Sequence, residues 1–201
     1  MELIYGTGNP AKLVWMRDIL QGLSIEIIPI QDVLSTLPNV PETGSSPLEN
    51  AHQKANAYYH LLHQPVFSCD SGLFFKELPD VLQPGVHVRN VQGTRLNDEE
   101  MISYYTSLAK AYGPLHGYYQ NAICLVVDEQ HIYESMDENL QSTTFLLTEK
   151  PYPVITPGFP LDSISIDMDT NQYFCEMDFI DESVGNHGCR NFFIDFLDKY
   201  E

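Results

Sequence analysis

Apolar and polar positions in the first 30 residues follow two different periods. Residues 2–5 and 24–30 are short, largely apolar runs that predict strands. Between them, Asn9 and Pro10 supply a helix cap and a first helical residue. The apolar residues that follow at helical spacing are Leu13, Met16, Ile19 and Leu20. The chain is therefore predicted to begin with a strand, a loop, a helix and a second strand.

A second helix is predicted to begin at Ser46. Ser46 caps, Pro47 takes the first helical position, and Glu49 completes an S-x-x-E capping box. The residues that would line the apolar face of this helix are Leu48, Ala51, Ala55, Tyr58 and Leu62. An N-x-x-E start predicts a further helix over residues 97–112.

The remaining pattern is rich in strands. Residues 65–69 and 72–75 predict two short strands on either side of a turn at Asp70 and Ser71. Later apolar runs, at residues 122–127, 144–147 and 164–166, predict strands that precede a final helix with Phe192, Phe193, Phe196 and Leu197. Helices that alternate with strands early, and hairpin-like strands later, favour an α/β fold with a mixed sheet flanked by helices. No linker or repeat divides the chain, so we expect a single domain over residues 1–201.

Composition and charge narrow the class of protein. At 201 residues and 43% hydrophobic content, the chain is long enough and apolar enough to bury a core. The formal net charge of -18 repels both polymeric nucleic acid and anionic membranes, although a small polyphosphate can still bind where the local field is reversed. No apolar run is long enough for a membrane helix, and no signal peptide follows Met1, so we expect a cytoplasmic protein. The four cysteines form no C-x-x-C pair and are interpreted as buried free thiols.

The first segment with chemical potential is the loop from Thr7 to Lys12. This glycine-containing turn lies between a strand and a helix start, where free backbone N–H groups and the helix dipole favour an anion such as phosphate. Lys12, in the first helical turn, can reach toward that anion. The alternative is a capped surface helix with a solvated lysine.

Two acidic segments follow. Glu42 lies in a flexible loop and can ligate a cation, or it can be a solvated loop acid, whereas Glu49 is favoured as the capping partner of Ser46. Asp70 interrupts two apolar strands and so places a carboxylate at a sheet edge. Carboxylates suit Mg²⁺ and can also activate a water molecule. A plain Asp-Ser-Gly turn is the alternative for Asp70.

Taken in order, these segments resemble the inosine triphosphate pyrophosphatases, which act on non-standard purine nucleoside triphosphates. The similarity continues through Gln83-Pro84-Gly85-Val86 and covers roughly the first 108 residues. It implies an elongated mixed sheet with flanking helices, two lobes with an active-site cleft between them, and a homodimer. It also implies Mg²⁺-dependent hydrolysis to a nucleoside monophosphate and pyrophosphate, which cleanses the nucleotide pool.

The resemblance assigns roles to individual residues. The phosphate-binding residues would be Thr7, Gly8, Asn9 and Lys12. Glu42 and Asp70 would engage Mg²⁺, Asp70 would activate the attacking water, and Ser71 with Gly72 would contact the substrate. Lys12 and Mg²⁺ would then neutralise charge in an in-line attack on phosphorus.

The segments that would bind the nucleobase depart from the family pattern. Cys69 replaces the first of two acids before Ser71, which predicts a change in metal affinity or stoichiometry. The family's Phe-Gly-Tyr-Asp segment reads Phe159-Pro160-Leu161-Asp162, so base stacking would depend on Phe159, with Asp162 as the retained acid.

The family's Ser-His-Arg segment is altered as well. His187 is retained, while the next arginine, Arg190, lies three residues later; both stay candidates for substrate contact. Because the pocket has changed, two other hypotheses stay open. One is a nucleotide-binding sensor without efficient turnover, and the other is a phosphohydrolase for a modified pyrimidine nucleotide.

Overall fold

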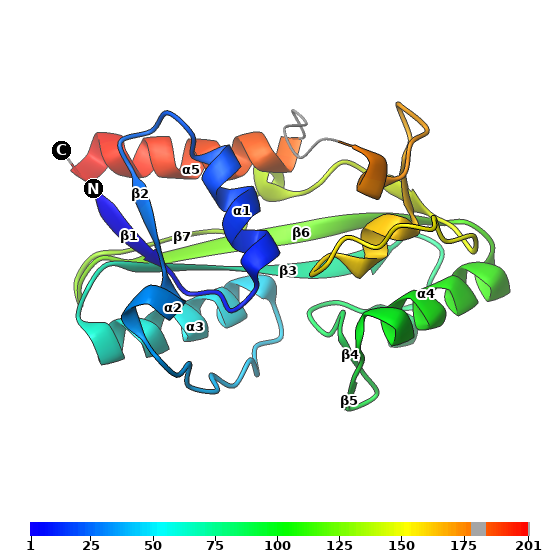
Figure 1. The fold of residues 1–201 in the computed structure, drawn as a ribbon, viewed down its shortest axis with the longest axis horizontal. Coiled ribbons are helices and arrows are strands. Elements are labelled where there is room, and N and C mark those ends of the chain that lie inside the picture. The colour runs from blue at the N-terminus through cyan, green and yellow to red at the C-terminus, as the bar shows by residue number, and fades with distance from the viewer. Residues whose placement is uncertain (178–183, 201) are drawn as a thin grey trace.

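A long antiparallel pair of strands spans the molecule in the computed structural model, which describes residues 1–177 and 184–200 (Figure 1). β3 (Val66–Phe75) pairs along its whole length with β6 (Leu115–Val126). β-branched and aromatic residues are frequent in both strands, and such residues favour extended backbone. All other strands of the main sheet attach to the ends of this pair.

Parallel and antiparallel neighbours complete the sheet, which confirms the predicted mixed topology. β1 (Glu2–Tyr5) lies between β2 (Glu26–Pro29) and β3 and is parallel to both. β7 (Ile132–Ser135) pairs with the last residues of β6, whereas β8 (Phe145–Leu147) pairs with its first residues and with β9 (Ser165–Asp167). β7 had not been predicted, because its exposed residues give it no apolar period.

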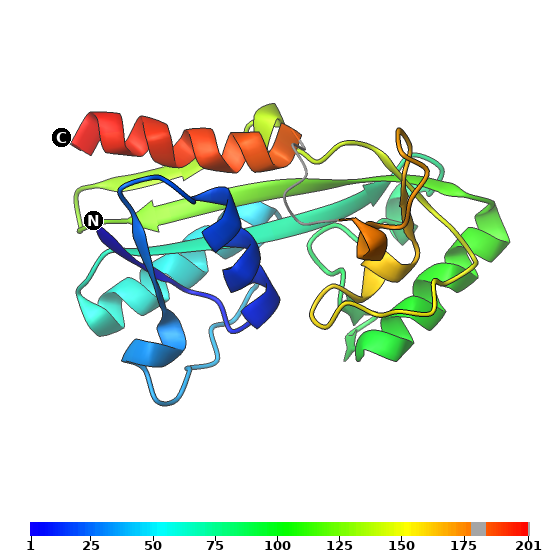
Figure 2. The same cartoon turned by 45° about the horizontal axis from the view of Figure 1, so that its top comes forward.

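Helices cover both faces of the sheet (Figures 1 and 2). α1 (Pro10–Ile19) and α5 (Val184–Tyr200) pack on one face, where Met16 and Phe193 join Phe67 in one buried cluster. α3 (Pro47–Leu62) packs on the other face through Ala51 and Ala55. α4 (Asp98–Tyr112) covers the opposite end of the β3–β6 pair and forms a separate apolar cluster there. The smaller elements are α2 (Ile30–Val33), β4 (Asn90–Val91), β5 (Thr94–Arg95), η1 (Asp80–Leu82), η2 (Glu138–Leu140), η3 (Pro160–Ser163) and η4 (Phe174–Glu176).

The helix starts follow the predicted caps. Asn9 accepts a hydrogen bond from the Ala11 N–H, Ser46 accepts one from Glu49, and Asn97 forms a full capping box with Glu100. The predicted box at Ser46 is only half present. The Glu49 carboxylate accepts from the N–H and hydroxyl of Ser45, and these bonds lower its pKa.

The predicted turn at Asp70 and Ser71 was wrong. β3 continues through both residues, because β6 pairs with them at Ala122 and Asn121. Asp70 is therefore a strand residue whose side chain points out of the sheet. A turn signal in the sequence was overridden by a partner strand about 50 residues away.

The cysteines agree with the interpretation as free thiols: Cys69, Cys124 and Cys189 are buried and Cys175 is half-buried. In the two described stretches of the chain, no helix combines the length and the hydropathy that a bilayer-spanning helix requires.

Gly188 allows α5 to touch the backbone of η2. A Cβ at this position would overlap the carbonyl oxygen of Asn139. Helix propensity favours Gly188→Ala by about 1 kcal/mol, but overpacking against backbone costs about 1–3 kcal/mol. We expect Gly188→Ala to lower the free energy of unfolding in urea denaturation. Asn191→Ala, at an exposed position of the same helix, serves as control and should not destabilise; equal stability of the two variants would contradict the packing argument.

Candidate active site

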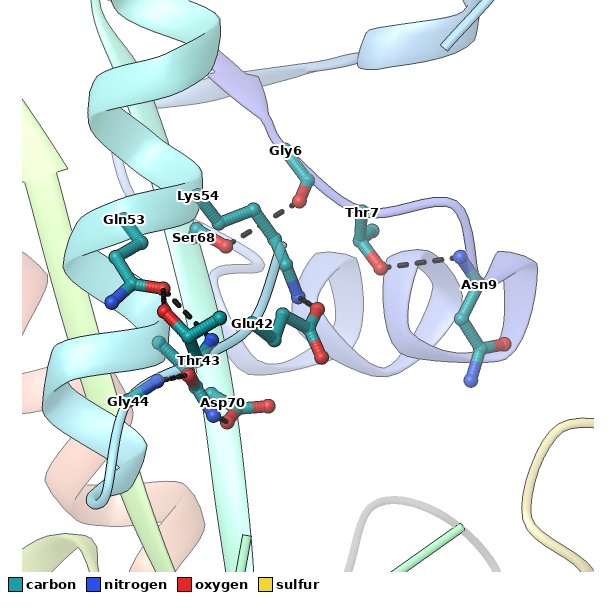
Figure 3. A network of polar contacts seen from close by, with 11 residues as sticks. Gly6, Thr7, Asn9, Glu42, Thr43, Gly44, Gln53, Lys54, Ser68 and Asp70 are labelled. Carbon is teal, nitrogen blue, oxygen red and sulfur yellow. Dashed lines mark hydrogen bonds and ion pairs between the residues drawn. The ribbon is translucent and has the colours of Figure 1, made fainter. Parts of the chain in front are cut away.

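A cleft of about 830 Å³ opens beside β3 and is lined by residues from both ends of the sheet. One wall begins with the loop after β1. Thr7, Gly8, Asn9 and Lys12 all line the cleft, as the phosphate-loop prediction requires. The Thr7 hydroxyl accepts a hydrogen bond from the Asn9 N–H at 3.2 Å, which holds the loop in a turn (Figure 3).

The loop is also fixed from outside. The Asn9 amide donates to the Gly158 carbonyl at 3.3 Å, while its oxygen caps α1. Gly158 has φ +86°, a conformation that favours glycine, and a Cβ there would lie 2.7 Å from the Asn9 oxygen. The segment before η3 is thereby joined to the start of α1, at the mouth of the cleft.

Asp70 lies deep in the cleft with a carboxylate that is largely buried. Burial raises its pKa, while the charges of Lys12 and Lys54 and a hydrogen bond from Asn50 oppose that rise. The Asn50 amide donates to Asp70 Oδ2 at 3.0 Å. Asn50 is 1% exposed, and its own oxygen accepts the Gly44 N–H at 2.8 Å. Asn50 therefore positions Asp70 and ties it to the loop before α3.

Glu42 and Lys54 form an ion pair at the side of the cleft (Figure 3). Glu42 comes from the loop before α3 and Lys54 from the second turn of α3. The Glu42 charge raises the pKa of Asp70, so the two carboxylates share one electrostatic environment. Oxygen donors of this kind fit a hard divalent cation. Such a cation would meet Asp70 in place, but it would have to draw Glu42 away from Lys54.

Two of these residues were missed by sequence reasoning. Asn50 and Lys54 are spaced i, i+4 in a predicted helix, directly beside the apolar positions Ala51 and Ala55. Polar residues that repeat at helical spacing next to a buried face were the available signal. The identity of their partners depends on the fold.

The far wall of the cleft carries an acid with an unusual proton affinity. Burial raises the pKa of Asp162, in η3, to about 7. Phe159 lines the same wall, and the buried Tyr119 has a pKa raised first by burial and then by the Asp162 charge. Near neutral pH, Asp162 is thus present both as a neutral carboxylic acid and as a carboxylate.

Arg89 and Arg95 reach the cleft from the segment that contains β4 and β5. Arg89 pairs with Asp98 at 2.8 Å and also donates to the Leu96 carbonyl, whereas Arg95 is exposed. Sequence reasoning missed both, since neither lies in a recognisable motif.

The cleft is formally neutral although the chain is strongly acidic. Among the described residues, those with charge that line it are Lys12, Lys54, Arg89, Arg95, Glu42, Asp70, Asp162 and Asp167. Four basic and four acidic groups balance there, in a chain of formal net charge -18. Protonation of Asp162 leaves the balance positive, which suits a polyphosphate.

The other predicted site residues lie in different places. Ser71 lines the cleft and donates to Asn121 at 2.7 Å, but Gly72 does not line it. His187 is exposed and also lies outside the set of cleft-lining residues. Arg190 donates through one guanidinium nitrogen to the carbonyls of Ile19 and Gln21, so it caps the end of α1. Substrate contact by Gly72, His187 and Arg190 stays a prediction.

Comparison with known proteins agrees with this geometry. The model of the Ham1 family matches residues 3–178. A dITP/XTP pyrophosphatase of Leptospira interrogans is 32% identical over 166 residues, which are 82% of this chain and 80% of that protein. A dITP/XTP pyrophosphatase of Porphyromonas gingivalis is 30% identical over 139 residues, 68% of this chain and 70% of that protein.

Solved structures show the same fold. The Staphylococcus aureus Ham1 protein superposes with a TM-score of 0.75 over the full length of both chains at 18% identity. A HAM1 protein from Coxiella burnetii gives a TM-score of 0.75 over 98% of this chain and 99% of that chain at 22% identity. These matches confirm the resemblance that the sequence motifs indicated. The chain belongs to the Ham1 family.

Proposed function

We propose that this chain hydrolyses a nucleoside triphosphate of the non-standard purine class, such as dITP or XTP, to a nucleoside monophosphate and pyrophosphate. The observation that carries the proposal is the buried Asp70, held by Asn50 and faced by Lys12 and Lys54 in a cleft large enough for a nucleotide. The dITP/XTP pyrophosphatases that match most of the chain support the same reaction. Removal of such nucleotides would cleanse the nucleotide pool.

The residues divide the work along the cleft. Backbone N–H groups of the Thr7–Lys12 loop, with Lys12 and Lys54, would bind the phosphates and neutralise charge on the transferred group. Asp70 would orient a water molecule for in-line attack on phosphorus and take up its proton. Glu42 and Asp70 would hold Mg²⁺, which when bound supplies Lewis-acid stabilisation of phosphate oxygens.

The far wall would hold the nucleobase. Phe159 offers an aromatic face for stacking, and Asp162 in its neutral form can both donate and accept a hydrogen bond at a base edge. Ser71 would contact the substrate from β3. We further propose a single domain of two lobes, supported by the two apolar clusters at opposite ends of the β3–β6 pair, which acts as a cytoplasmic homodimer.

Loss of either central charged group should abolish most of the turnover. We expect Asp70→Ala and Lys12→Ala each to lower kcat/KM by about 10²-fold or more, a few kcal/mol of transition-state stabilisation. Pyrophosphate release with Mg²⁺ would be measured over ITP, XTP, dITP, the four standard triphosphates and modified pyrimidine triphosphates. Lys110→Ala, at an exposed position on α4, is the control.

The panel separates the hypotheses. Near-normal rates in both variants would refute the assigned roles. Turnover of a pyrimidine triphosphate alone would keep the chemistry and reassign the substrate. Binding of nucleotide without pyrophosphate release would identify a sensor.

Asn50 should act through the proton affinity of Asp70. Its hydrogen bond lowers the pKa of Asp70, so Asn50→Ala should raise that pKa. Activity that needs the ionised carboxylate is lost as pH falls through this pKa, and the acid limb of the kcat/KM profile should move to higher pH. Asn56→Ala, a half-buried position on the same helix, should leave the limb in place. An unmoved limb in Asn50→Ala would show that Asn50 has no influence on the ionisation.

Asp162 should also make stability depend on pH. Its pKa is about 7 in the folded chain and about 3.9 when unfolded, so between these values the folded state keeps a proton that the unfolded state has released. The free energy of unfolding should therefore fall as pH rises from about 4 to 7, by up to about 1.4 kcal/mol per pH unit, and level off above. Urea denaturation without metal or nucleotide should show a smaller slope in Asp162→Asn and an unchanged slope in Asp32→Asn, where the acid is exposed. Equal slopes in all three proteins would contradict burial of an acid that ionises near pH 7.

A further inference from the structure

Three side chains with different donor atoms meet on the flank of α3 that lies toward β7. They are His52 from α3, Cys124 from β6 and Glu134 from β7, and one ligand atom of each lies within 4.8 Å of the others. His52 Nδ1 is 2.8 Å from Glu134 Oε2 and 3.8 Å from Cys124 Sγ. None of the three lines the proposed active-site cleft.

The sheet register brings two of these groups to the same face. Cys124 pairs directly with Glu134 across β6 and β7, and residues opposite each other in an antiparallel pair point to the same side. Cys124 belongs to the apolar cluster under α3, together with Ala51 and Ala55, so that side faces the helix. His52 then approaches from α3 itself.

Burial gives the cluster a closed floor and an open side. Cys124 is 0% exposed, whereas the side chains of His52 and Glu134 are each 42% exposed. An ion at this place would bind the thiolate at its inner end and would reach solvent between the other two ligands. The open position would be filled by water.

We propose that His52, Cys124 and Glu134 form a binding site for a zinc-class divalent ion. One sulfur, one imidazole nitrogen and one carboxylate oxygen are the donors that Zn²⁺ accepts, whereas Mg²⁺ prefers oxygen alone. Zinc lies about 2.3 Å from sulfur and about 2.0–2.2 Å from nitrogen and oxygen, so the ligand atoms of a tetrahedral site are roughly 3.3–3.7 Å apart. The sulfur–nitrogen distance is close to that spacing. The nitrogen–oxygen distance is that of a hydrogen bond and would open by roughly half an ångström, which the exposed Glu134 side chain can accommodate.

Binding exchanges protons for the ion. Burial and the Glu134 charge raise the pKa of the Cys124 thiol to about 12, so the free site holds a proton on sulfur. When the ion binds, the S–H bond breaks, a sulfur–metal bond forms and the proton passes to water. His52 would bind through Nδ1 with its remaining ring proton on Nε2.

The position of the site on α3 suggests its role. Successive helical residues are about 100° apart, so His52 points about 200° away from Asn50 and on the flank opposite Lys54. An ion there would join α3 to β6 and β7 and hold the helix that carries Asn50 and Lys54. This structural role does not rest on the proposed reaction.

Cobalt is the probe for the test, since Co²⁺ takes zinc sites and gives visible and near-ultraviolet absorption. The full chain would be freed of metal with a chelator, supplied with excess Mg²⁺ and titrated with Co²⁺. We expect one equivalent to bind with a thiolate-to-cobalt charge-transfer band. Cys124→Ser and His52→Ala should lose this band, and Glu134→Gln should weaken binding by about 10-fold or more.

Matched controls exclude other cysteines and histidines. Cys175→Ser and His60→Ala, the latter at an exposed position on α3, should keep the band and the stoichiometry. Zn²⁺ should raise the Tm of the chain and of both controls, but not that of His52→Ala. Should Cys124→Ser fail to fold, His52→Ala and Glu134→Gln decide, because they alter half-exposed side chains. No charge-transfer band, or a band that survives in His52→Ala, would overturn the proposal.

Discussion

A carboxylate buried in the middle of a continuous strand sets the arrangement of the active-site half of this protein. An ionised group away from water is costly unless opposite charges and hydrogen bonds compensate for the lost hydration. Asp70 on β3 receives this compensation from Asn50 and Lys54 on α3 and from Lys12 on α1. The two helices lie on opposite faces of the sheet, so the carboxylate is stabilised only when both are in place.

The same requirement explains how an acidic chain can accept a polyphosphate. Charges beyond a Debye length, about 8 Å at physiological salt, are largely screened, whereas groups in the cleft act at a few ångströms in a lower dielectric. The substrate would therefore respond to the local balance of four basic and four acidic groups and far less to the formal charge of -18. Asp162 tilts this balance toward positive charge whenever it holds its proton.

Local signals in the sequence were sufficient for the elements and for the outline of the cleft. The caps at Asn9, Ser46 and Asn97 fixed three helix starts, because a side chain and the N–H groups it caps are neighbours in the chain. Asp70 was predicted to lie in a turn, however, since nothing local reveals its pairing with Ala122 of β6. The cleft positions of Arg89 and Arg95 were missed for the same reason. Contacts between distant segments decide these features, and no periodicity encodes them.

The departure at Cys69 gains a physical meaning from strand geometry. Cys69 and Asp70 are consecutive strand residues, so their side chains point to opposite faces of the sheet. Cys69 turns toward Tyr5 in the cluster beneath α1 and α5, and burial raises the pKa of its thiol to about 12. A neutral thiol in that position adds no hard ligand and no negative charge. The proposed cation is then left with Asp70, which is fixed, and Glu42, which is paired with Lys54. A triphosphate that attracts Lys54 would release Glu42 for the cation, so substrate and metal should bind to this cleft cooperatively.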